Sequence, residues 1–182
     1  MDNKRRCRWC NERNPVYIEY HDREWGVPRF DDPYLYEMLI LESFQAGLSW
    51  ECVLNKREAF RRAYDGFDCE MVCAYGEDKI AQLCADPAII RNKRKIEASI
   101  RNSRVFKDIV AELGSFYAYL VQFTGDGVIC EAGKTTSEVS DAISRDLRRR
   151  GMTFVGSTVI YSYLQAIGLI DAHEKDCYLY KN

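Results

Sequence analysis

The chain has 182 residues, of which 47% are hydrophobic and 13% aromatic, so it can bury one sizeable core and is not intrinsically disordered. Its basic N-terminus lacks the apolar stretch of a signal peptide, and no run of about 18 apolar residues could span a membrane. We therefore expect a cytoplasmic protein with reduced cysteines and no membrane partner. The formal net charge of −2 does not indicate a general affinity for nucleic acid, although a small basic patch would suffice for local phosphate contact.

Helical periodicity runs through almost the whole sequence. Asp32-Pro33 combines an N-cap carboxylate with a proline in the first turn, which predicts that a helix starts there and continues to Gly47. The expected helices cover 32–47, 50–64, 77–85, 92 to beyond 105, 115–123, 140–150 and 157–167. This succession predicts an all-α fold.

The second half of the chain contains further signals for a loop, for helix ends and for a strand. The stretch 124–136 contains three glycines and is typical of a loop. Ser140 is expected to cap the helix that follows, and Gly151 to end it. The best strand signal is short and covers 152–155.

Two acids lie in the first of these helices, which is apolar all round. At 100° per residue, Glu42 falls within an apolar stripe, whereas Glu37 lies on the opposite, also apolar side. Glu37 is in the first turn, where the helix dipole and solvent can stabilise its charge. Glu42 lies deeper in the helix, where a buried carboxylate needs a bonding partner or a functional role. We interpret Glu42 as a candidate functional residue, with a buried structural salt bridge as the alternative.

Aromatic residues are concentrated in the same N-terminal part of the chain. Together with a buried acid they could form a pocket for a flat, cationic or hydrogen-bonding ring, through stacking and cation–π attraction. Packing in the core is the alternative for each of them. The residues are Trp9, Tyr17, Tyr20, Trp25 and Trp50.

The turn 86–95 places two isoleucines before a basic helix start. Backbone N–H groups and positive charge at such a helix start can bind a phosphate group. The candidate contacts are Ile90, Arg91, Asn92 and Lys93. A solvated basic helix start explains the same residues equally well.

Each of the two histidines in the chain lies near a cysteine, with Cys7 and His21 at one end and His173 and Cys177 at the other. Thiolate and imidazole are the ligands of structural zinc, so one zinc site could join the first and last segments. The alternative is chance, because eight cysteines place one near any histidine.

Three segments occur in order along the chain: YIEYHDREWGVP at 17–28, LESFQAGLSW at 41–50 and FVGSTVIYSYLQA at 154–166. Together with His173 and Cys177 they resemble the DNA-3-methyladenine glycosylase I family over essentially the whole chain. The resemblance implies a single glycosylase domain, 1–182, with an all-α helix-hairpin-helix fold. Its hairpin would lie at about 77–105, and its zinc clamp would be formed by 1–25 and 168–182.

The resemblance also implies roles for individual residues. Glu42 would be the acid that binds the base, Trp50 the stacking tryptophan and Tyr20 a pocket tyrosine, with Tyr17, Trp9 and Trp25 lining the same pocket. One structural zinc would be held by Cys7, His21, His173 and Cys177, with Cys10 as a rival for Cys7. The sequence departs from the family pattern at Ser43-Phe44, beside the acid, and at Asp171-Ala172, beside the second histidine.

The implied activity is excision of 3-methyladenine from alkylated double-stranded DNA by a monomer, which releases the free base and leaves an abasic site. Leu48 would fill the gap left by the flipped nucleotide. Two other classes stay open: a glycosylase with lyase activity that uses Lys93 or Lys95 as a Schiff-base nucleophile, and a non-enzymatic, zinc-stabilised DNA-binding module.

Overall fold

Helix α2 (Asp32–Gln45) lies at the centre of the fold in the computed structural model, which describes residues 4–180. Ten of its side chains are buried, on all sides of the helix, as its apolar sequence predicts. The N-cap is Asp31, one residue before the expected one, and its carboxylate accepts a hydrogen bond from the backbone N–H of Tyr34. Asp32 instead accepts one from the N–H of Phe116, at 2.9 Å, and so holds the start of another helix.

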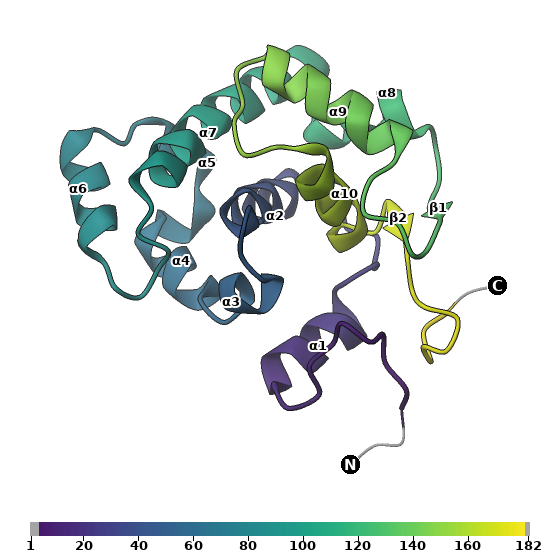
Figure 1. Cartoon of the computed structure of the whole chain (residues 1–182). Coiled ribbons are helices and arrows are strands. Elements are labelled where there is room, and N and C mark those ends of the chain that lie inside the picture. Colours follow the sequence, from purple (N-terminus) through teal and green to yellow (C-terminus); the bar gives the residue numbers. More distant parts are fainter. Residues whose placement is uncertain (1–3, 181–182) are drawn as a thin grey trace.

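The other elements are mostly helical, which confirms the predicted helical class. Figure 1 shows α7 and α10 beside α2, with α9 lying over α10. The helices are α1 (Pro15–Arg23), α3 (Trp50–Leu54), α4 (Arg57–Ala63), the 3-10 turn η1 (Asp65–Phe67), α5 (Cys69–Cys73), α6 (Glu77–Ala85), α7 (Lys93–Leu113), α8 (Phe116–Thr124), α9 (Glu138–Arg149) and α10 (Ser157–Ala166). Two short strands, β1 (Ile129–Cys130) and β2 (Ile170–Asp171), pair in parallel, and β1 lies within the stretch expected to be a loop.

The expected helix over 50–64 is divided into α3 and α4. Lys56 interrupts it with non-helical backbone angles (φ −103°, ψ 1°), and its ammonium group donates to the carbonyl oxygen of Ala88 at 3.0 Å. A helix later in the chain also begins earlier than expected. Ser137, not Ser140, caps α9, and Ser140 completes a capping box from the third helical position.

The predicted strand at 152–155 is wrong. Phe154 has a left-handed backbone (φ 57°), which a strand does not allow. The side-chain amide of Asn102 takes the place of a strand partner, since it donates to the carbonyl of Thr153 and accepts from the N–H of the same residue, at 2.9 and 3.0 Å. The segment is therefore a fixed loop against α7.

The N-terminal and C-terminal segments lie on one side of the fold and contact each other (Figure 1). The N–H of Tyr178 donates to the carbonyl of Arg5 at 2.8 Å, and the N–H of Arg8 donates to Glu174 at 2.9 Å. The outermost parts of the expected clamp, 1–3 and 181–182, lie outside the described residues. Within 4–180, no helix is both long and apolar enough to cross a membrane.

Candidate functional site

A cavity of about 230 Å³ lies between the N-terminal segment, α1, α2, α3 and α10. It is lined by Trp9, Tyr17, Tyr20, Trp25, Glu42, Gln45, Trp50, Ser162 and Gln165. The structure thus brings together Glu42 and all five aromatic residues that were singled out in the sequence. A larger hollow of about 570 Å³, between α2, η1, α5 and α7, contains none of the expected site residues.

Glu42 is the buried acid of this cavity, with only 2% of its surface exposed. Its Oε2 atom is buried and has no hydrogen-bond partner among the described residues. Burial raises the pKa of Glu42 well above its ordinary value, because a desolvated carboxylate is costly. The salt bridge that was the structural alternative for Glu42 is not formed within 4–180.

The aromatic residues form a continuous wall around the acid. The rings of Trp50 and Tyr20 are 5.5 Å apart, and Trp9 contacts the Trp25 ring edge to face at 4.8 Å. The indole Nε1 of Trp50 is also buried without a partner among the described residues. The pKa of Tyr20 is raised by burial first and by the nearby charge of Glu42 second, as expected if both line one cavity. Within 4–180, the cavity thus contains an unpartnered polar atom on Trp50 as well as one on Glu42.

Sequence reasoning missed three polar residues of this cavity, Gln45, Ser162 and Gln165. Gln45 is the last residue of α2, one turn after Glu42, and Ser162 and Gln165 are three positions apart on α10. Helical spacing from Glu42 could have identified Gln45. No signal in the sequence places α10 against α2, so its two residues could not have been found that way.

A second group of side chains joins the two ends of the described chain. The metal-binding atoms of Cys7, His21 and Cys177 all lie within 4.8 Å of one another, and all three residues are buried. Such a group could hold a metal ion. Cys10 lies outside it, with its thiol 3.7 Å from the carbonyl of Tyr17. The ring of His173 lies 5.7 Å from that of His21.

Both histidines are oriented by a carboxylate. Nδ1 of His21 is 2.8 Å from Asp22, and Nδ1 of His173 is 2.7 Å from Asp171. This arrangement leaves Nε2 of each ring for another partner, as in histidines that bind metals. Nε2 of His173 is buried and has no partner among the described residues.

The aromatic wall of the cavity contacts the two histidines at the chain ends. Trp25 contacts the ring of His173 at 4.7 Å, and Trp9 contacts the ring of His21 at 5.2 Å. Gly26 has a left-handed backbone (φ +74°), and a Cβ there would lie 2.9 Å from the ring of His173. The position of the wall therefore depends on where the two histidines are held.

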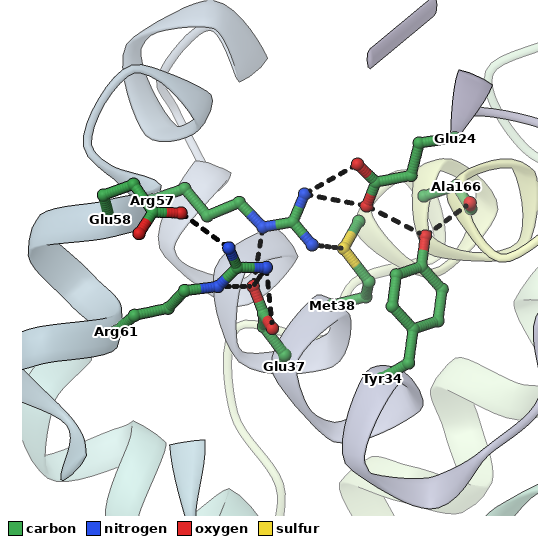
Figure 2. A network of polar contacts seen from close by, with 8 residues as sticks. All are labelled: Glu24, Tyr34, Glu37, Met38, Arg57, Glu58, Arg61 and Ala166. Carbon is green, nitrogen blue, oxygen red and sulfur yellow. Dashed lines mark hydrogen bonds and ion pairs between the residues drawn. The ribbon is translucent and has the colours of Figure 1, made fainter. Parts of the chain in front are cut away.

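An ion-pair network around the buried Arg57 joins α4 to α1 and α2, two of the helices that line the cavity (Figure 2). Arg57 of α4 donates to Glu24 at 2.7 Å and to Glu37 at 2.6 Å, and Arg61 also donates to Glu37, at 2.9 Å. Glu24 caps the end of α1 and accepts a hydrogen bond from the hydroxyl of Tyr34 at 3.1 Å. Glu37 is thus satisfied by two arginines, and the expectation that solvent satisfies it is wrong. The network joins α1, α2 and α4.

The loop between α2 and α3 carries Leu48, whose side chain is 42% exposed. Lys95, near the start of α7, donates from its buried ammonium group to the carbonyl oxygens of Phe44 and Ala46, at 2.8 and 2.6 Å. Of the two residues beside the acid that depart from the family pattern, Ser43 donates to the carbonyl oxygen of Ile40, and the ring of Phe44 packs in the core. Neither lines the cavity.

The turn between α6 and α7 places Arg91, Asn92 and Lys93 at the surface, with Ile90 half-buried beside them. The side chain of Asn92 caps α7 by accepting a hydrogen bond from the N–H of Lys95 at 3.2 Å. These four expected contact residues therefore form one short surface at the start of a long helix.

Known proteins resemble this chain in both sequence and structure. A sequence profile described as methyladenine glycosylase matches residues 9–180. DNA-3-methyladenine glycosylase 1 of Escherichia coli (strain K12) is 42% identical over 182 residues, covering 96% of each chain. A crystal structure of a 3-methyladenine DNA glycosylase I is similar at a TM-score of 0.91 and 37% identity, over 97% of this chain and 100% of that one. A structure concerned with 3-methyladenine recognition by 3-methyladenine DNA glycosylase I from Staphylococcus aureus is similar at a TM-score of 0.90 and 33% identity, over 95% of each chain. The chain therefore belongs to the methyladenine glycosylase family.

Proposed function

We propose that this protein, a glycosylase of base excision repair, excises 3-methyladenine from alkylated double-stranded DNA by hydrolysing its N-glycosidic bond. The products are the free base and an abasic site, with no lyase step. The observation that carries the proposal is Glu42, a buried acid inside an aromatic cavity, with an oxygen that no residue within 4–180 contacts by a hydrogen bond. A module that only binds phosphate groups has no need of such a cavity.

The chemistry of the substrate explains the composition of the cavity. Methylation at N3 gives adenine a positive charge, which weakens the glycosidic bond and makes the base a good leaving group. The nucleotide must first leave the duplex, at a cost of a few kcal/mol that is smaller for a damaged pair. Water then attacks the sugar carbon as the bond breaks. The enzyme therefore needs selective binding more than strong acid–base catalysis.

Glu42 and Trp50 supply that selectivity. Trp50 stacks on the flipped purine, and its ring face favours a cation over neutral adenine. Glu42 accepts a hydrogen bond from the edge of the base, and the charge of the base offsets the cost of ionising a buried carboxyl group. Tyr20 completes the wall beside them, and Tyr17, Trp9 and Trp25 exclude water. Gln45, Ser162 and Gln165 offer further hydrogen-bonding groups in the same cavity.

DNA approaches this cavity from the side of the exposed loop between α2 and α3. Leu48 would fill the space of the extruded nucleotide, because an apolar side chain can stack between the neighbouring bases. α6 and α7 would act as a helix-hairpin-helix element in a single glycosylase domain. Its turn, with Ile90, Arg91, Asn92 and Lys93, would contact the phosphate backbone.

The metal of the group at the chain ends is proposed to be one structural zinc, with His173 as the fourth ligand besides Cys7, His21 and Cys177. The donor set fits, since it offers two thiols and two imidazoles, and the Nε2 atom of His173 is otherwise unpartnered within 4–180. Bound zinc would supply a cross-link between the two segments. Four protein ligands leave no position for a reactive water, so the residues of the cavity perform the reaction.

Release of free base from methylated DNA tests the proposal. The wild-type protein should release 3-methyladenine, and Glu42→Gln should release it about 10–100-fold more slowly, as expected for loss of a hydrogen bond to a charged group. An unchanged melting temperature would show that the variant is folded. Undiminished release by Glu42→Gln would remove Glu42 from the reaction. DNA binding by the wild type without any base release would favour the non-enzymatic alternative.

A further inference from the structure

A basic groove lies beside the start of α7, outside the cavity described above. It has a volume of about 310 Å³ and is lined by Arg94, Glu97, Arg101, Thr153 and Phe154. Its one acid, Glu97, pairs with Lys93 at 3.7 Å. Among residues 4–180, Arg94 and Arg101 have no carboxylate within ion-pair distance, and both are exposed.

Elsewhere within 4–180 the chain also has exposed arginines without an ion pair, such as Arg62, but here two of them line one groove. The 28 acids of the chain outnumber its 26 lysines and arginines, and arginines such as Arg8, Arg29 and Arg150 are paired with carboxylates. Arg101 donates a hydrogen bond to the hydroxyl oxygen of Thr153 at 3.5 Å, but neither its guanidinium group nor that of Arg94 has a carboxylate partner within 4–180. Two such groups in one groove create a local positive potential on an acidic protein. A guanidinium group is suited to phosphate, because its N–H groups match two phosphate oxygens at once.

The far wall of the groove is held rigidly in place. Asn102 binds both backbone groups of Thr153, and the hydroxyl of Ser144 donates to the carbonyl of Val155 at 2.7 Å. Phe154 keeps a left-handed backbone, which is strained for a residue other than glycine. A strained conformation that is fixed by its surroundings is typical of functional sites.

A third arginine extends the positive surface along the same loop. Arg148 of α9 is exposed, and its guanidinium group is 3.2 Å from the position that a Cβ of Gly156 would take. The N-cap of α10 is Gly156, which has no side chain to accept a hydrogen bond from the first turn. Figure 1 shows this loop between α9 and α10 running past α7.

Lys95 contacts both the wall of the groove and the loop that carries Leu48. The ammonium group of Lys95 lies 5.8 Å from the ring centre of Phe154 and bonds to the carbonyl of Ala46. Ala46 precedes Gly47 and Leu48 directly. The groove therefore lies on the side from which DNA would reach the cavity.

We propose that Arg94 and Arg101, with Arg148 beyond them, bind the phosphate backbone of the DNA and so extend the contact surface beyond the turn at 90–93. The proposal rests on the proposed function, since the DNA is the substrate. The groove adds affinity and fixes the position of the duplex, and it does not contact the reacting base.

The test is the salt dependence of binding to a duplex that contains a stable abasic-site analogue. Each phosphate contact contributes about 0.9 to the slope of log K against log salt for duplex DNA. Arg101→Gln and Arg94→Gln should each lower that slope by about one and weaken binding at low salt. Arg101→Lys should keep the slope, because it keeps the charge. Arg62→Gln is the matched control, since Arg62 is exposed on α4 and has no ion pair among the described residues.

Two further measurements separate this proposal from the proposed function. Quenching of tryptophan fluorescence by free 3-methyladenine should be the same in all variants, as should base release at saturating DNA. If Arg94→Gln and Arg101→Gln both keep the wild-type slope and affinity while the protein still releases the base, the proposed role of the groove is wrong and the proposed function is unaffected. Failure of the wild type to release the base would overturn the proposed function.

Discussion

The ammonium group of Lys95 lies 2.6 Å from the carbonyl oxygen of Ala46. Lys95 belongs to the first turn of α7 and Ala46 is the C-cap of α2, so this hydrogen bond joins the expected DNA-binding turn to the loop that carries Leu48. A positive charge at the C-terminal end of a helix satisfies its free carbonyl groups and its dipole. An amine held in this way is not free to attack a sugar, which argues against Lys95 as a Schiff-base nucleophile.

Lys95→Met should therefore impair action on DNA more than binding of the free base. The substitution keeps the apolar stem but leaves two carbonyl groups unpaired, at a cost of about 1–3 kcal/mol of folding stability. Base release from alkylated DNA should slow, while quenching of tryptophan fluorescence by 3-methyladenine should persist. Lys93→Met, at an exposed position of the same turn, is the control for stability.

The lyase alternative is tested with the same proteins. Borohydride should trap no covalent adduct between the wild-type protein and alkylated DNA. An adduct that disappears in Lys95→Met would contradict both the assignment of Lys95 and the absence of a lyase step.

Glu42 should make the protein less stable as the pH rises. Because burial raises its pKa, the folded state keeps the proton of Glu42 to a higher pH than the unfolded state. The resulting stabilisation is complete below the ordinary carboxyl pKa and is lost as the pH rises through the raised pKa. Glu42→Gln lacks this dependence, so its melting temperature should increase relative to the wild type from about pH 5 upward. A difference that is constant with pH would show that Glu42 is ionised in the free cavity.

The metal group should determine the shape of the aromatic wall. Protein purified without added metal should contain about one zinc per chain. Cys177→Ser should lower the zinc content and the melting temperature, and it should change tryptophan fluorescence because Trp9 and Trp25 contact His21 and His173. Cys10→Ser should keep its zinc, since Cys10 lies outside the group. Fully folded, metal-free wild-type protein would contradict this prediction.

Arg57 should be important for stability because it neutralises two acids inside the fold (Figure 2). Removing one partner of a buried ion pair costs about 3–5 kcal/mol, and each kcal/mol lowers the melting temperature of a domain of this size by about 2–4 °C. Arg57→Met should therefore lower the melting temperature by roughly 10 °C. Arg62→Met, on the exposed face of the same helix, should have almost no effect, and an equal loss in both variants would show that the network is not the cause.

The sequence predicts which residues line the cavity better than it predicts the contacts that hold them in place. Glu42 and Trp50 could be found because an acid within an apolar helix and an aromatic cluster are local patterns. The partners of Glu37 could not, since Arg57 and Arg61 reach it only through the packing of α4 on α2. The strand prediction at 152–155 is wrong because the short apolar pattern is typical of a strand, whereas tertiary hydrogen bonds between Asn102 and Thr153 decide the conformation.

Helix α1 was missed for a different reason. It has little apolar periodicity, yet Asn14 caps it and Pro15 follows at the first position, and this signal was available in the sequence. The groove of Arg94 and Arg101 also could not be predicted from the sequence. Their lack of ion pairs is visible only when every carboxylate nearby has been placed.

The contacts that join the two ends of the chain also have a consequence for the order of folding. His21 and Cys177 are 156 residues apart in the sequence, and Arg8 and Glu174 are 166 apart. Closing so long a loop costs more entropy than forming the local helix contacts, so we expect these contacts to form late. The helical body around α2 would then assemble first, and the wall of Trp9 and Trp25 last. The ability to hold a base would appear only with the final step of folding.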